Sequence, residues 1–178
     1  LLLSALLLSC SDSRLERALE QSGNNRAELE RVLAHFEESG DTLKLNAAKF
    51  LIRNMPYNHF HAGREADLYD SAYIAMSEVA LQDREKTFKE HAGKIPVGNM
   101  TAVADITNLT ADFLINAIDE ACNVWRESSW NTEYDTAFFY EYVLPYRILN
   151  ESPSDGRSFI RQEYPFLNRK TVLSKRGE

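Results

Sequence analysis

The chain has 178 residues, of which 44% are hydrophobic and 26% charged, so it is long and apolar enough to bury the core of one ordinary domain. Its 27 acidic and 20 basic side chains give a formal net charge of -7, and because an acidic surface repels phosphate backbones we expect no nucleic-acid partner. Two cysteines exclude a disulfide scaffold and a four-cysteine zinc site.

The first ten residues read LLLSALLLSC and carry no charge. This run is too short to span a bilayer as a helix, which takes about 20 residues. It has the length of the apolar core of a signal peptide. The sequence LLSC at 7–10 resembles the lipobox of bacterial lipoproteins, in which the cysteine becomes the lipidated N-terminus of the mature protein.

We therefore expect a truncated signal peptide over residues 1–9, a lipid on Cys10 and a polar tether over 10–24. Buried acyl chains would hold the protein on a membrane of the bacterial cell envelope without a spanning helix. Which leaflet it faces stays open. The alternative is that the apolar run forms a buried N-terminal helix of the domain.

Apolar residues then recur at helical spacing. The first predicted helix begins at a capping box at Asn25 and ends at Gly40, and the second begins at Asp41 and ends before Pro56. The connection between these two helices is so short that they should be antiparallel neighbours.

A loop is expected over about 55–66, followed by one long helix from Asp67 to about His91. The segment Thr101–Thr110 is compatible with a short strand or a 3₁₀ turn. Thr110 caps a clear amphipathic helix, and Asp135 caps an aromatic helix over Phe138–Leu144. A short helix is expected around 158–163. The sequence thus predicts an all-α fold over 25–165, an irregular multi-helix bundle of about six to seven helices with long loops.

Three segments carry a family resemblance: 47–56 (AAKFLIRNMP), 119–125 (DEACNVW) and 139–150 (FYEYVLPYRILN). They resemble the N-terminal helical region of transglutaminase-like lipoproteins from Bacteroidetes bacteria, over roughly residues 25–165. In that family a papain-like core with catalytic Cys, His and Asp follows this region and carries acyl-transfer or peptide-hydrolysis chemistry. The resemblance therefore implies that residues 166–178 are a linker to a downstream transglutaminase-like domain.

No catalytic residue is carried over from the family. Its catalytic cysteine begins a helix after a Gly-rich turn, where the helix N-terminus favours the thiolate. Cys10 is better explained by lipidation, and Cys122 lies in the middle of an apolar helical stripe with Ile118 and Trp125, which is typical of a small buried hydrophobe. We expect no catalytic residue and no cofactor in this chain.

The C-terminal third is dense in aromatic residues, which indicate either a core or a surface for a ligand or a second domain. The candidate ligand-binding or domain-docking residues are Trp130, Tyr134, Tyr140, Glu141, Tyr146 and Arg147. Arg147, with Glu141 and Glu151 nearby, is expected to form an ion pair that fixes the turn after Pro145.

His59 and His61 are weak candidates for a metal site, since two imidazoles in a loop do not fix a coordination geometry by themselves. The main functional hypothesis is a non-catalytic accessory domain that packs on and positions the papain-like core. The alternative is a free-standing cell-surface module that binds a glycan or a peptide. A contiguous apolar patch would favour the first, and a groove with aromatic and carboxamide groups the second.

Overall fold

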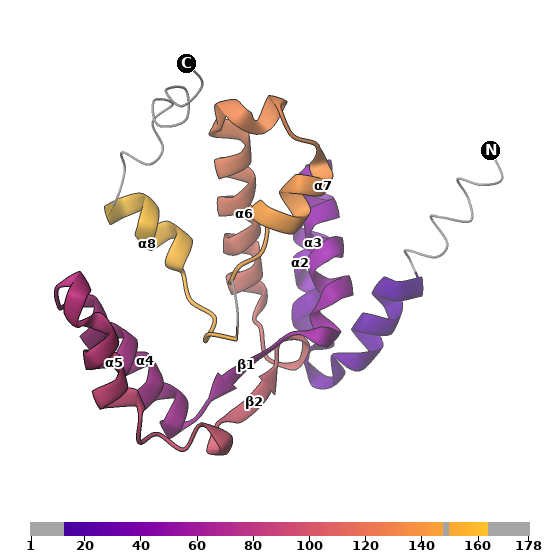
Figure 1. Cartoon of the computed structure of the whole chain (residues 1–178). Coiled ribbons are helices and arrows are strands. Elements are labelled where there is room, and N and C mark those ends of the chain that lie inside the picture. The colour runs from indigo at the N-terminus through magenta and orange to yellow at the C-terminus, as the bar shows by residue number, and fades with distance from the viewer. Residues whose placement is uncertain (1–12, 148–149, 164–178) are drawn as a thin grey trace. The chain divides into compact units, whose positions relative to one another are not determined.

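The computed structural model describes residues 13–147 and 150–163 (Figure 1). Over these residues the fold is all-α apart from one two-stranded sheet, which confirms the predicted fold class. The chain divides into two compact units. Unit 1 contains Leu1–Asn58, Ala104–Ile148 and Pro153–Glu178, and unit 2 contains His59–Val103 and Leu149–Ser152. The single helical region expected over 25–165 is thus built as two units.

Unit 1 begins, in the described part of the chain, with a helix over 13–21. This helix lies in the segment that we expected to be a tether. Its residues Ala18 and Leu19 are buried and belong to the core of the unit. Helical structure therefore starts upstream of residue 25. Cys10 lies outside the described residues.

Three longer helices form the body of unit 1: α2 (Arg26–Ser39), α3 (Thr42–Asn54) and α6 (Ala111–Glu127), which pack against one another (Figure 1). α2 ends at Gly40, whose φ of 68° is left-handed and suits glycine. Asp41 then caps α3 by accepting a hydrogen bond from the Lys44 N–H. Two adjacent residues thus end one helix and start the next, as the sequence predicts.

The core of unit 1 lies between these helices. Among its fully buried large side chains are Leu29, Val32, Phe36, Ile52, Met55, Leu114, Ile118, Phe139 and Leu144. Burying one such side chain stabilises the fold by about 1.5–3 kcal/mol.

The N-terminus of α6 is fixed twice, since Thr110 accepts from the Phe113 N–H and Glu28 of α2 accepts from the Ala111 N–H at 2.6 Å. That backbone hydrogen bond, with the Arg31 guanidinium, lowers the pKa of Glu28.

The aromatic segment follows α6. A 3₁₀ turn, η6 (Ser129–Thr132), leads to α7 (Thr136–Phe138), which continues as the π-helical η7 (Phe139–Val143). Asp135 accepts from the Phe138 N–H at 3.0 Å, so the predicted cap is present.

The last described helix is α8 (Gly156–Glu163). Arg157 fixes it to α6 and to the end of the η7 segment by donating to the carbonyl oxygens of Ala117, Val143 and Pro145.

Unit 2 contains the sheet, formed by β1 (His59–Ala62) and β2 (Thr101–Ala104), and a helical hairpin of α4 (Arg64–Ser77) and α5 (Arg84–Ala92). The single long helix expected from Asp67 to about His91 is therefore wrong. The chain turns back over residues 78–83, which brings α4 and α5 together. The rings of Tyr69, Tyr73 and Phe88 then pack, with centroids 4.8 to 5.5 Å apart.

No helix among the described residues is long and apolar enough to cross a membrane.

Candidate functional site

The six candidate residues of the aromatic segment lie at three separate places on unit 1. Trp130 and Tyr134 belong to a surface row of rings, Tyr140 packs on α3, and Tyr146 with Arg147 binds a buried carboxylate. Glu141 is exposed beside the row of rings. The structure therefore does not gather the six into one site.

The row of rings consists of Trp130, Tyr134, Phe138 and Tyr142, and we call it the aromatic ladder. Trp130 meets Tyr134 edge to face with centroids 6.3 Å apart, Tyr134 stacks on Phe138 at 4.2 Å, and Phe138 faces Tyr142 at 4.9 Å. Phe138 and Tyr142 are four residues apart in the helical segment and share one of its faces, whereas Tyr134 lies in the turn before the Asp135 cap and stacks on Phe138 from there. Tyr134 is 47% and Tyr142 75% exposed, and the ladder is therefore a surface feature.

The ladder is fixed to the core at its Trp130 end. Trp130 packs edge to face on Trp125 of α6 with centroids 5.4 Å apart, and Trp125 contacts the buried Phe139 at the same separation. Trp125 itself is buried. The exposed rings thus extend from a packed aromatic cluster, which limits their conformational freedom before any partner binds.

Acidic residues flank the ladder. Glu133 and Glu141 are exposed, and neither has an ion-pair partner among the described residues. The whole stretch between Arg126 and Arg147 contains no lysine or arginine. The segment that carries the ladder therefore presents exposed rings and exposed carboxylates but no basic side chain.

Tyr140 lies in the interface with α3 instead. Its ring stacks on Phe50 with centroids 5.0 Å apart and an interplanar angle of 14°, and the Arg53 guanidinium lies over Phe50 at 5.4 Å. Burial raises the pKa of the Tyr140 hydroxyl. These contacts make Tyr140 part of the packing that holds η7 against α3.

Tyr146 and Arg147 meet at Asp105, which is fully buried. The Tyr146 hydroxyl donates to Asp105 Oδ2, and Arg147 Nη2 lies 2.6 Å from the same oxygen. Burial, and then the hydrogen bond to Asp105, raises the pKa of Tyr146, so the phenol stays protonated and acts as a donor. Asp105 Oδ1 is buried and accepts no hydrogen bond from a described residue. The buried charge of the Asp105 carboxylate is thus stabilised by Tyr146 and Arg147.

Backbone hydrogen bonds of Asp105 also fix the position of the chain around it. Its backbone N–H donates to the Asn58 carbonyl at 3.1 Å, and its carbonyl accepts from the Leu109 N–H at 2.9 Å. Asn25 donates to the carbonyls of Ile106 and Leu109. The segment that starts at Asp105 is therefore held by Asn25 just before α2, by Asn58 after α3, and by Tyr146 and Arg147 after Pro145.

Asp105 was not foreseen from the sequence, which places Glu141 and Glu151 near Arg147. The structure pairs Arg147 with Asp105, a carboxylate 42 residues upstream. The signal that was available is an aspartate between Ala104 and Ile106, because an acidic residue within an apolar run needs a partner when it is buried.

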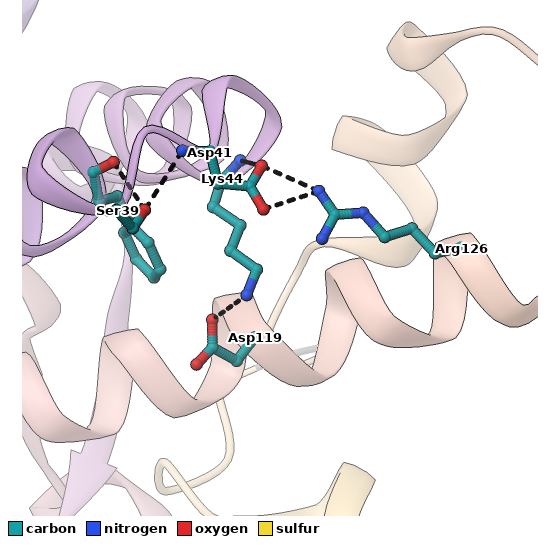
Figure 2. A network of polar contacts seen from close by, with 6 residues as sticks. Ser39, Asp41, Lys44, Asp119 and Arg126 are labelled. Atoms are coloured by element: carbon teal, nitrogen blue, oxygen red, sulfur yellow. Dashed lines mark hydrogen bonds and ion pairs between the residues drawn. The ribbon is translucent and has the colours of Figure 1, made fainter.

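A network of polar side chains joins the start of α3 to α6 (Figure 2). Asp41 accepts two hydrogen bonds from Arg126 Nη2, at 2.8 and 2.7 Å, and Lys44 Nζ lies 2.9 Å from the buried Asp119 Oδ1. Burial alone would raise the pKa of Asp41, but the Arg126 and Lys44 N–H hydrogen bonds outweigh it and lower that pKa. These contacts form a clamp that holds the start of α3 against α6.

Cys122 lies beneath this clamp in the core and is fully buried, as the helical stripe predicts. Burial raises the pKa of its thiol to about 11. A thiolate is the nucleophilic form of cysteine, so this side chain is unsuited to covalent catalysis.

His59 and His61 lie together on β1, with ring centroids 5.6 Å apart. Within the described residues no group of three or more His, Cys, Asp or Glu side chains could hold a metal ion. The histidine pair therefore has no third ligand there, and a zinc site needs at least three protein ligands.

Comparisons with protein-family models, with curated proteins and with solved structures find no match to this chain. The likeness to transglutaminase-like lipoproteins therefore stays an expectation based on the three sequence segments.

Proposed function

We propose that this chain is a non-catalytic helical accessory domain of a lipid-anchored transglutaminase-like protein, and that it packs on and positions a papain-like core. The observation that supports a docking role is the exposed aromatic ladder on unit 1. Tyrosine and tryptophan are enriched in the energetically important parts of protein interfaces, because they bury large rigid surfaces.

The position of Cys122 is consistent with this role. A buried thiol with a raised pKa serves packing rather than acyl transfer. The nucleophilic thiol of a transglutaminase-like protein would therefore be a cysteine other than Cys122.

The form of the ladder favours a protein partner over the alternative, a free-standing glycan-binding module. A sugar ring stacks on an open aromatic face, but Phe138 lies between Tyr134 and Tyr142, at 4.2 and 4.9 Å, so the exposed ring at the end of the row, Tyr142, is the main face left for stacking. A protein surface can pack on ring edges as well as faces. A contiguous row of rings is thus better suited to docking a domain or a peptide.

The first test is to read the genomic DNA in frame beyond codon 178. An encoded papain-like core with its Cys, His and Asp supports the accessory role. A stop codon directly after Glu178 contradicts that role and leaves the free-standing module as the hypothesis.

The second test uses the purified chain and a separately purified papain-like core of a transglutaminase-like lipoprotein, with binding measured by calorimetry. We expect Tyr134→Ser/Tyr142→Ser to weaken binding at least tenfold, since hot-spot truncations remove about 2 kcal/mol each. The control is Tyr57→Ser, which removes another exposed ring of unit 1 that is 82% exposed and lies outside the ladder. Equal binding by the ladder variant and the control, or binding of oligosaccharide instead of the core, contradicts the proposal.

A further inference from the structure

Two exposed glutamates lie next to the aromatic ladder in the chain, and their charge indicates which class of partner the ladder binds. Glu133 and Glu141 are both exposed and lie directly beside the ladder residues Tyr134 and Tyr142 in the chain. Neither forms an ion pair with a described residue.

Several other carboxylates of unit 1 are paired within the chain. Arg126 pairs with Asp41, and Arg161 with Glu120 and Glu127. The stretch that carries the ladder instead has no basic residue of its own between positions 126 and 147. The charges of Glu133 and Glu141 are therefore not balanced by a basic residue of the same stretch.

The rings themselves attract cations. The electron-rich face of tyrosine or tryptophan favours an ammonium or guanidinium group placed over it. The chain uses this interaction at two other rings, where Arg53 lies over Phe50 and Arg147 over Tyr146, at 5.4 and 5.6 Å. Among the described residues no cation lies over a ring of the ladder, and Tyr142 at its end is the most exposed of the four.

We infer that the aromatic ladder binds an arginine- or lysine-rich segment of its partner, with Tyr142 receiving a cationic side chain and Glu133 and Glu141 providing opposite charge. This inference rests on the proposed docking role and specifies the chemistry of the surface that docks. Arginine suits such a surface best, because its planar guanidinium stacks on a ring while it donates to a carboxylate.

The test uses a fluorescent peptide of alternating arginine and serine residues, with binding to the full chain followed by fluorescence anisotropy at low and physiological salt. The comparison peptide carries citrulline in place of each arginine, which keeps the shape and removes the charge. We expect binding of the arginine peptide that weakens with salt, and at least fivefold weaker binding of the citrulline peptide.

Two variants examine the two components separately. Glu133→Gln/Glu141→Gln removes the charge, and Tyr142→Leu removes the aromatic face while keeping an apolar side chain; each should weaken binding of the arginine peptide by about fivefold. The matched control is Glu37→Gln/Glu38→Gln on α2, two adjacent exposed carboxylates that form no ion pair with a described residue. It should leave the affinity unchanged.

Three results would overturn the inference: no binding of the arginine peptide, equal binding of the citrulline peptide, or an equal loss in the α2 control, which would indicate attraction by net charge alone. The same variants separate this inference from the proposed function. If Tyr134→Ser/Tyr142→Ser abolishes binding of the papain-like core while Glu133→Gln/Glu141→Gln has no effect on it, the docking role stands and the cationic partner is rejected.

Discussion

At the scale of single residues, Asp105 is the side chain on which the most distant parts of unit 1 depend. A buried carboxylate is stable only while its partners remain, and Arg147 is 8% exposed, so each charge is buried against the other. The Leu-Pro-Tyr-Arg sequence at 144–147, which lies in one of the three segments of the family resemblance, thus has a structural role.

We predict that Asp105→Asn destabilises the protein by about 3–5 kcal/mol, because it removes the carboxylate from its buried ion pair with the Arg147 guanidinium. Tyr146→Phe should remove about 1–3 kcal/mol, because it removes only a hydrogen bond to the buried carboxylate. The free energy of unfolding in urea, followed by circular dichroism, measures both.

The control is Asp112→Asn, since Asp112 is 83% exposed in its pair with Arg31 and such pairs contribute about 1 kcal/mol or less. Replacing both partners, in Asp105→Asn/Arg147→Met, should cost less than Asp105→Asn alone. If Asp105→Asn destabilises no more than Asp112→Asn, the buried pair does not have the role argued for it.

Lipidation is also decided at one residue. Cys10→Ala should prevent labelling by a palmitate analogue and leave the protein in the soluble fraction of cells that process lipoproteins, because two or more acyl chains are what would hold it on the membrane. The test compares membrane and soluble fractions after metabolic labelling, with Cys122→Ala as the matched cysteine control. Membrane attachment that persists in Cys10→Ala would reject the anchor.

At the scale of helices, the contacts of α3 with α6 make the fold sensitive to acid. The pKa of Asp41 is lowered in the folded state by its contacts with Arg126 and the Lys44 N–H. A carboxylate with a lowered folded pKa adds stability above its unfolded pKa of about 3.9, and this stability is lost as the pH falls through the folded pKa.

We therefore predict that the free energy of unfolding falls on acidification below about pH 4, and that it falls less steeply in Asp41→Asn. Arg126→Met should flatten the same region of the profile, because it removes the cation while leaving the carboxylate in place. Urea denaturation at a series of pH values gives both profiles. A wild-type slope in Arg126→Met would assign the acid sensitivity to other carboxylates.

The sequence predicts those elements whose ends are set by neighbouring residues, and it misses those that are set by contacts with distant parts of the chain. Gly40 and Asp41 end one helix and start another by their own backbone and side-chain chemistry, so both were predictable. The break between α4 and α5 was missed because residues 78–83 (EVALQD) contain no glycine or proline, and the turn there is stabilised by packing of the two helices. Local signals cannot report such a contact.

The same reasoning applies to the candidate site. Phe138 and Tyr142 share a helix face by their spacing, so this part of the ladder follows from the sequence once the helix is known. Tyr134 precedes the Asp135 cap, and its stacking on Phe138 depends on the turn before the helix. The pairing of Arg147 with Asp105 joins residues 42 positions apart, and no short-range pattern contains it. The separation of Tyr140 from the ladder likewise depends on Phe50 of another helix.

At the scale of the whole molecule, the two units differ in how much they bury. The described residues of unit 2 bury only Ala66, Ala72 and Ala92, and the Tyr69–Tyr73–Phe88 rings that join α4 to α5 stay partly exposed. Unit 1 buries a full set of large apolar side chains. Stability from burial scales with apolar area, so opening of unit 2 should require less free energy.

We predict that amides of α4 and α5 exchange with deuterium through openings of smaller free energy than amides of α2, α3 and α6, as measured by hydrogen-exchange mass spectrometry. Phe88→Ala should lower the protection of α4 and α5 by about 2 kcal/mol and leave that of α3 unchanged, because the ring packs only on Tyr69 and Tyr73 among the described aromatic contacts. Equal protection of α4 and α3 in the unmodified chain would mean that unit 2 unfolds only together with unit 1, and a loss of protection in α3 caused by Phe88→Ala would lead to the same conclusion.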